Sequence, residues 1–310
     1  MVLSPEKRHY LGKRTGKALL RLATYILLID LSFVFVYPFL YMLTTSFKSY
    51  DDLHNLLVNW IPTGINWQNY ELAADAMAVG ETLWHSLLVT VFATIGHLLS
   101  CSFIGYGFAR FNFPLKNAFF FGVILSAALP IQVMIVPLYM VYNQMGILNT
   151  FWPLILPTYL GFGLRGGVFI YLFRQFFYGF PATLEEAARI DGCGRIRSFF
   201  RIALPAAGPT IVVTTVLSMV WHWNDYYEPS VYLNAGSKTA LLTQMLPDLY
   251  TIISSQISQT DEANQLELMM MYHEGVVMAA TAIAILPLLI AYAFLQRKFM
   301  ESIELTGLVG

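Results

Sequence analysis

The chain has 310 residues, of which 57% are hydrophobic and only 12% are charged, whereas soluble domains carry about 25% charged residues. Together with a mean hydropathy of +0.58, this composition excludes a soluble globular chain and a disordered one. A net charge of −1 excludes the basic surface of a nucleic-acid-binding protein, and the two cysteines lie outside any Cys/His cluster.

Hydrophobic runs long enough to cross a bilayer core of about 30 Å occur six times along the chain. They cover Leu19–Phe47, Leu83–Phe108, Asn117–Val141, Phe151–Phe173, Pro209–Tyr226 and Gly275–Leu295. The first run is too long for a cleaved signal peptide, so we expect it to be retained. The sequence therefore predicts an all-α, polytopic membrane protein with six transmembrane helices, in which a basic cytoplasmic tail (residues 1–18) precedes a single transmembrane domain (residues 19–310).

The distribution of basic residues predicts that both termini are cytoplasmic, because cytoplasmic segments carry the excess of Lys and Arg. With six spans and an inner N-terminus, fifteen of the 18 basic residues fall in inner segments, and only Lys48 and Lys238 fall in outer loops. The long outer loops cover about residues 48–82 and 227–274, and both are acidic. We expect Asn264–Tyr272 to form a short external helix before the last span.

The cytoplasmic loop of about residues 180–205 is predicted to hold two short helices between the fourth and fifth spans. Thr183, followed three residues later by Glu186, has the pattern of a capping box, which predicts a helix start. Gly192 should end this helix, and the second should run from about Arg195 and stop before Pro205. The second helix has a 3–4 apolar spacing opposite a basic face. The apolar residues are Ile196, Phe199, Phe200 and Ala203, and the basic ones are Arg197 and Arg201.

This loop resembles the EAA loop of the membrane subunits of bacterial ABC importers. The matching positions are Glu186, Ala187, Ala188, Asp191, Gly192, Phe200, Ile202, Leu204 and Pro205. Cys193 stands where that family usually has alanine, which is a change between small residues. Three further segments are similar to the carbohydrate-type permeases, of the kind of the smaller maltose-permease subunit: Trp60–Pro62, Asn69–Tyr70 and Trp223–Asp225.

The resemblance implies that residues 19–310 are the permease domain of an ATP-driven importer in the bacterial cell membrane, forming half of the pathway for an oligosaccharide or related carbohydrate. The chain is then not an enzyme. It has no GxxxxGK[ST] motif, so ATP and Mg are expected on an ATPase subunit dimer, and no cofactor or metal on this chain. The other implied partners are a second, non-identical permease subunit, an extracytoplasmic solute-binding protein and membrane lipid. In the family the EAA helix docks in a cleft of the ATPase, which implies an ATPase-coupling contact at Glu186, Ala187, Asp191 and Gly192.

Four polar or aromatic residues are candidates for the substrate path: Arg165, Trp221, Asn224 and Asp225. Arg165 lies at membrane depth, where an ionisable group is a functional candidate, although a charge that snorkels or pairs within the bundle remains the alternative. Aromatic rings with Asn and Asp suit a sugar, but an aromatic belt at the outer interface would also place Trp221 here. The GxGxxG pattern of residues 161–166 lies in an apolar run rather than after a strand, so we interpret it as a break in the fourth span.

Two alternative functions remain open at this stage. One is an ABC importer permease for another solute, such as a glycerophosphodiester or a peptide-like compound. The other is a stand-alone secondary transporter, which would be expected to have inverted repeats or paired intramembrane carboxylates or histidines. The sequence contains neither, and a secondary transporter would leave the EAA-like loop unexplained.

Overall fold

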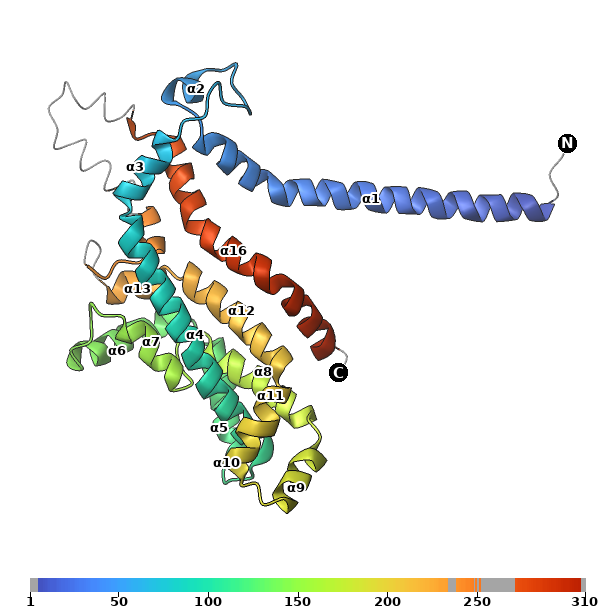
Figure 1. Cartoon of the computed structure of the whole chain (residues 1–310), viewed down its shortest axis with the longest axis vertical. Coiled ribbons are helices and arrows are strands. Elements are labelled where there is room, and N and C mark those ends of the chain that lie inside the picture. Colours follow the sequence, from blue (N-terminus) through green and yellow to red (C-terminus); the bar gives the residue numbers. More distant parts are fainter. Residues whose placement is uncertain (1–4, 234–237, 248, 250, 252–270, 308–310) are drawn as a thin grey trace. The chain divides into compact units, whose positions relative to one another are not determined.

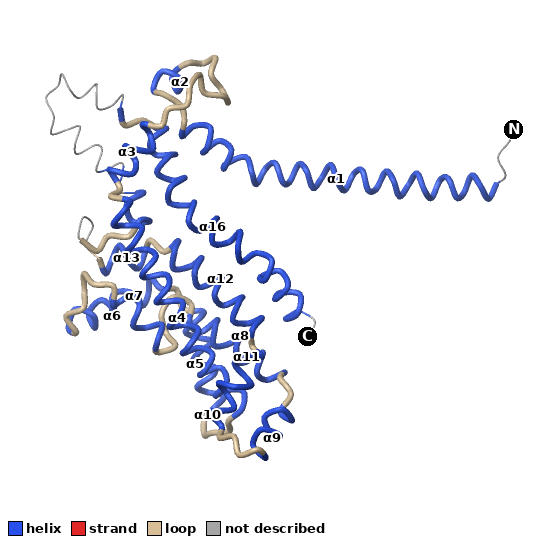
Figure 2. The backbone as a smooth tube through the Cα atoms, in the orientation of Figure 1, coloured by secondary structure: helices blue, strands red, loops and turns tan. Residues whose placement is uncertain are grey.

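The computed structural model describes residues 5–233, 238–247, 249, 251 and 271–307, and within them it contains helices and no strand (Figure 1, Figure 2). The helices are α1 Pro5–Ser46, α2 Tyr50–His54, α3 Gln68–Ala76, α4 Val79–Arg110, α5 Lys116–Ala128, α6 Ile131–Gln144, α7 Trp152–Tyr159, α8 Gly166–Gly179, α9 Ala182–Ile190, α10 Arg195–Ser198, the π-helix η1 Phe199–Ala203, α11 Leu204–Ala206, α12 Gly208–Asn224, α13 Tyr227–Tyr232 and α16 Glu274–Gly307. The chain forms two compact units, residues 1–73 with 262–282 and residues 74–261 with 283–310.

Three described helices are long and apolar enough to cross a membrane: Leu19–Ser46 within α1, all of α4, and Glu274–Ser302 within α16. Two bent pairs, α5 with α6 and the segment 195–206 with α12, raise the number to five if each pair is one span. The prediction of membrane helices is therefore confirmed, whereas the number six stays a prediction. The expected external helix at 264–272 lies mainly outside the described residues.

Breaks in the helices occur where glycine and proline predict them. Between α5 and α6 the chain turns by 102° at Pro130, which has no N–H to continue the hydrogen-bond ladder of α5. The fourth predicted span is divided between α7 and α8, and in the loop between them Gly161 and Gly163 have φ values of +72° and +94°. These backbone angles favour glycine, so the expected break in this span is confirmed.

In the first unit, a buried asparagine donates hydrogen bonds to carbonyl groups at the C-terminal end of α1. The side-chain amide of Asn69 donates to the carbonyl oxygens of Ser46 and Lys48 at 2.8 and 2.9 Å. These carbonyls follow the last turn of a helix and have no partner within it. Lys48 in turn donates from Nζ to the carbonyl of Asn59 at 2.8 Å, so the loop after α2 is tied to the same point.

In the second unit, α4 is the central helix, and α7, α8 and α12 pack against it (Figure 1). Close approach between α4 and α8 depends on Gly105, where an added Cβ would lie 2.7 Å from Phe173 Cβ and 2.8 Å from the backbone nitrogen of Arg174. Small residues allow such packing inside a membrane. Next to this crossing lies an aromatic core, whose members include Tyr106, Phe169, Phe173, Phe177 and Phe199. Phe199 of this core belongs to the loop that carries the EAA-like sequence.

Candidate functional site

The first candidate site is α9, which lies at one end of the second unit (Figure 1). Its sequence is rich in Ala, Glu and Leu, which have high helix propensity. The helix ends at Ile190, and Gly192 follows with a φ of +79°, as predicted. The capping-box prediction is wrong: the helix begins at Ala182 after Pro181, and no side chain caps it. Thr183 lies inside the first turn, because Pro181 already supplies a residue with fixed, non-helical backbone before the helix.

Glu185 fixes α9 to the end of α4. Its two carboxylate oxygens accept hydrogen bonds from Arg110 Nε and from the hydroxyl of Tyr106, both at 2.8 Å. Arg110 also donates to the carbonyl oxygen of Phe180, just before the helix, at 2.6 Å. Glu185 is 5% exposed, so this is a largely buried ion pair in which both carboxylate oxygens accept a hydrogen bond. The sequence analysis did not identify Glu185, whose only local signal is that it directly precedes the glutamate of the EAA pattern.

The four predicted coupling residues lie on the surface of this loop. Glu186, Ala187, Asp191 and Gly192 are all exposed. Two apolar neighbours are exposed with them, Leu184 at 51% and Ile190 at 86%. Within the described residues, Glu186 forms no ion pair. The helix thus presents a mixed polar and apolar surface, while Glu185 holds its other side.

The second segment of the loop differs from the prediction in two respects. The helical path does not stop before Pro205 but continues to Ala206, through the π-helix η1. The wider π-helical turn precedes the proline, whose ring would clash with the preceding turn of a regular α-helix. The predicted apolar face is also only half correct, because Phe199 and Ala203 are buried whereas Ile196 is 67% and Phe200 is 53% exposed. Burial follows a spacing of four residues towards the aromatic core, which leaves the other two at the surface.

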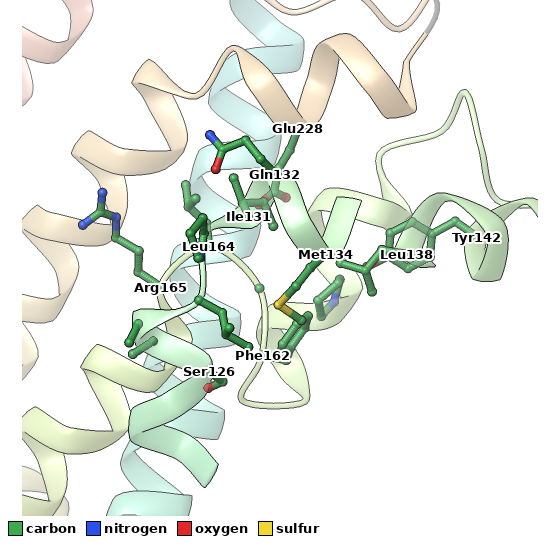
Figure 3. A pocket seen from close by; sticks show the side chains of 16 residues that line it. Ser126, Ile131, Gln132, Met134, Leu138, Tyr142, Phe162, Leu164, Arg165 and Glu228 are labelled. Atoms are coloured by element: carbon green, nitrogen blue, oxygen red, sulfur yellow. The ribbon is translucent and has the colours of Figure 1, made fainter. Parts of the chain in front are cut away.

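The second candidate site is the predicted substrate path, of which the structure brings together two members. Arg165, in the loop between α7 and α8, places its guanidinium 4.8 Å from the centre of the Trp221 ring. It has a left-handed backbone with a φ of 59°. A cavity of about 320 Å³ lies beside this loop at the break between α5 and α6. Arg165 is itself one of the residues that line the cavity, and Figure 3 shows its side chain directed away from two others, Phe162 and Met134.

The other two predicted path residues have local contacts. Asn224 is exposed and donates from Nδ2 to the carbonyl of Val220 in its own helix, at 2.8 Å. Asp225 accepts hydrogen bonds at Oδ1 from the backbone nitrogens of Tyr227 and Glu228, at 3.1 and 3.4 Å. These bonds join Asp225 to the first two backbone nitrogens of α13, whose N-cap residue is Tyr226. A substrate contact for either residue stays a prediction.

Glu228 of α13 is a polar residue of this region that the sequence analysis missed. It lines the cavity at the α5–α6 break (Figure 3) and is 7% exposed. Its Oε1 has no hydrogen-bond partner among the described residues. Burial, with a smaller contribution from the charge of Asp225, raises the pKa of Glu228 to about 8. The residue therefore holds a proton near neutral pH, and a protonated carboxyl can donate to a ligand oxygen in the cavity.

Replacing Glu228 with glutamine tests this protonation. Since the folded state keeps the proton between the ordinary pKa of 4.5 and about 8, the wild type should lose stability as the pH rises through that range. The glutamine side chain does not titrate in this range. The melting temperature of the variant should therefore rise relative to that of the wild type between pH 5 and pH 8. Thermal unfolding in detergent measures both, with exposed Glu81→Gln as the control. If the melting temperatures of the wild type and of Glu228→Gln change equally between pH 5 and pH 8, Glu228 is not protonated in the folded state as inferred.

Among the described residues, no group of three or more His, Cys, Asp and Glu side chains is arranged to hold a metal ion. The contacts that the structure gives for the two sites are hydrogen bonds, an ion pair and a cation–π contact. Neither site contains a nucleophile paired with a base in the described ranges, and the two sites lie in the same compact unit.

Known proteins resemble this chain over nearly its whole length. The sequence profile described as "Binding-protein-dependent transport system inner membrane component" matches residues 101–304. A probable permease of the starch degradation products transport system of Thermoanaerobacterium thermosulfurigenes is 31% identical, with 89% of this chain and 92% of that protein covered. A polygalacturonan/rhamnogalacturonan transport permease of Bacillus subtilis is 27% identical, with 92% and 96% covered.

A solved structure shares the fold. It is a chain of a bacterial ABC transporter involved in the import of the acidic polysaccharide alginate, with a TM-score of 0.74 and 20% sequence identity. The match covers 96% of this chain and 99% of that one. A probable ABC transporter permease of Pyrococcus horikoshii is 30% identical over 88% of this chain and 90% of its own length. The resemblance predicted from the EAA-like loop is thereby confirmed.

Proposed function

Because the chain belongs to the family of inner membrane components of binding-protein-dependent transport systems, we propose that it forms half of the translocation pathway of an ABC importer. The chain is a multi-pass membrane protein of the ABC permease type. Its substrate in this proposal is an oligosaccharide or related carbohydrate, the class named for the starch-product and polygalacturonan relatives. In this proposal the chain crosses the membrane six times, and both of its termini lie in the cytoplasm.

The arrangement of α9 carries the proposal for energy coupling. Two adjacent glutamates of this helix have opposite environments: Glu185 is buried against Arg110, and Glu186 is exposed. An anchored helix with a free outer surface transmits a push as a rigid body, because the ion pair joins it directly to the end of α4. In this proposal Glu186, Ala187, Asp191 and Gly192 contact an ATPase subunit, and ATP and Mg bind to that subunit.

The proposal requires three partners besides the membrane. A second, non-identical permease subunit would complete the pathway, a dimer of ATPase subunits would drive it, and an extracytoplasmic solute-binding protein would deliver substrate to the outer loops. The path residues on this chain would be Arg165, Trp221, Asn224 and Asp225. Cation–π contact already orients the first two, which leaves the remaining guanidinium donors of Arg165 free for hydroxyl groups.

Transport in proteoliposomes tests the function and the substrate class together. The chain is purified with its partners, reconstituted, and supplied with ATP and a panel of solutes, each with its binding protein. We expect ATP hydrolysis to rise with oligosaccharides and to remain at its basal rate with glycerophosphodiesters and peptides. Stimulation by either of the latter would contradict the carbohydrate assignment. Uptake that proceeds without ATP on an ion gradient would contradict the importer assignment itself.

A further inference from the structure

A second cavity adjoins α9. It shares Arg110 and Glu185 with the anchor of that helix, but its lining contains none of the predicted coupling or substrate-path residues. It has a volume of about 270 Å³ and lies between the end of α4, the loop that follows, α9 and α10. Its lining includes three arginines, Arg110, Arg189 and Arg195, together with Glu185 and Ser198. We call it the arginine pocket. Its charge and its unused donors indicate what it can bind.

The arginine pocket has an excess of positive charge. Glu185 neutralises Arg110, and the two oxygens of its carboxylate are occupied by Arg110 and by the Tyr106 hydroxyl. Arg189 and Arg195 form no ion pair within the described part of the chain. The guanidinium of Arg195 lies over the ring of Phe111, 5.1 Å from its centre. This aromatic contact holds the charge at the wall of the cavity without neutralising it.

A buried hydroxyl in the same lining also has an unused hydrogen bond. Ser198 is 2% exposed, and its Oγ has no hydrogen-bond partner among the described residues. Buried polar atoms in folded proteins nearly always have a partner, so the Ser198 hydroxyl has a hydrogen-bond donor that the described residues do not use. Ser198 lines the pocket together with the two arginines. Its Oγ is enclosed by the protein, so the hydroxyl would reach a bound acceptor after rotation of the side chain about χ1.

We propose that the arginine pocket binds a phosphate group, held by the guanidinium groups of Arg189 and Arg195 and by the hydroxyl of Ser198. Arginine matches phosphate oxygens in geometry and charge, and its fork can donate two parallel hydrogen bonds. The cavity is also large enough for a phosphate with an ester substituent. At the predicted cytoplasmic end of α4, that chemistry comes from an anionic lipid headgroup or from free phosphate.

Binding there would join the two helices of the cytoplasmic loop. Arg189 belongs to α9 and Arg195 to α10, and between them lie Gly192 and Gly194, where an added Cβ would meet nothing within 4 Å. Backbone hydrogen bonds such as Cys193 N to the carbonyl of Ala188, at 2.9 Å, define the turn between the helices, and no described side chain packs against its two glycines. A phosphate group bound by both arginines would bridge the two helices. The binding itself is independent of the proposed transport function.

Binding by the purified full chain tests the proposal in two arms. In one arm, detergent-purified protein is titrated with inorganic phosphate and its melting temperature is followed. In the other, the chain is extracted from nanodiscs of mixed phosphatidylglycerol and phosphatidylcholine, and native mass spectrometry counts the retained lipid. The variants are Arg189→Gln and Ser198→Ala. The matched control is Arg197→Gln, which removes the same charge from an exposed residue of α10 outside the lining.

We expect Arg189→Gln to weaken binding about tenfold or more, since it removes charge-assisted hydrogen bonds, and Ser198→Ala to weaken it less. Arg197→Gln should remain near the wild type. Retention of phosphatidylglycerol alone would support a lipid headgroup as the source, and a melting shift with inorganic phosphate would support free phosphate. If neither binds, or if Arg197→Gln loses as much as Arg189→Gln, the site does not exist as proposed. If the pocket is instead filled only by a side chain of the ATPase, neither phosphate nor phosphatidylglycerol should bind to the purified chain.

Discussion

Replacing Glu185 with alanine is expected to lower the free energy of unfolding by about 3–5 kcal/mol, because it leaves the buried charge of Arg110 without its partner. The side chains of this pair are only 15% and 6% exposed, so the carboxylate is replaced by little solvent at most, apart from water in the adjoining cavity. The Tyr106 hydroxyl also loses its acceptor. Thermal unfolding of the purified chain in detergent, together with its yield from the membrane, measures the effect.

Two further variants separate this prediction from a general effect of substitution in α9. Glu186→Ala removes the neighbouring carboxylate from an exposed position and should change the free energy of unfolding by no more than about 0.5 kcal/mol. The double variant Arg110→Leu/Glu185→Leu removes both charges and should recover part of the loss. Equal destabilisation by Glu185→Ala and Glu186→Ala would contradict the buried ion pair.

Replacing Gly105 with alanine is expected to lower the free energy of unfolding by about 1–3 kcal/mol, the usual cost of adding atoms to a close-packed interface. The new methyl would meet Phe173 Cβ at 2.7 Å and the backbone nitrogen of Arg174 at 2.8 Å. Backbone cannot rotate out of the way as a flexible side chain can, so α4 and α8 must separate. The melting temperature in detergent gives the size of the effect.

Gly107 provides the matched control in the same helix. A Cβ at this position would meet nothing within 4 Å, so Gly107→Ala should be neutral or stabilise the chain by up to about 1 kcal/mol through helix propensity. If both alanine variants have the same melting temperature, the helices are not in contact at Gly105. A loss confined to Gly107→Ala would contradict the packing of α4 on α8 altogether.

Local signals predict much of this fold. Apolar length identifies α1, α4 and α16, and Gly161, Gly163 and Pro130 mark the breaks between the shorter helices. These features depend on the backbone preferences of single residues or on hydropathy along one segment. The direction and size of a bend, such as the 102° between α5 and α6, depend on the neighbouring helices and cannot be derived from the segment itself.

In the candidate sites, too, features that depend on local sequence could be predicted, whereas those that depend on residues distant along the chain could not. The EAA pattern locates α9 and its exposed residues, because its spacing is local. Glu185 was missed since its partners Tyr106 and Arg110 lie 79 and 75 residues away along the chain. The burial of Glu228 likewise arises from helices distant in sequence. By contrast, the contacts of Asp225 are local, since it accepts hydrogen bonds from backbone nitrogens two and three residues further along the chain.

Copurification of an ATPase tests the central claim of energy coupling through α9 most directly. The wild-type chain is isolated from its native membrane in mild detergent beside Glu186→Arg, Gly192→Asp and the control Glu81→Arg, which changes an exposed glutamate in the first turn of α4. We predict that a P-loop ATPase and a second permease accompany the wild type and the control. We also predict that Glu186→Arg and Gly192→Asp lose the ATPase but keep the second permease. Full recovery of the ATPase with both variants would contradict the account.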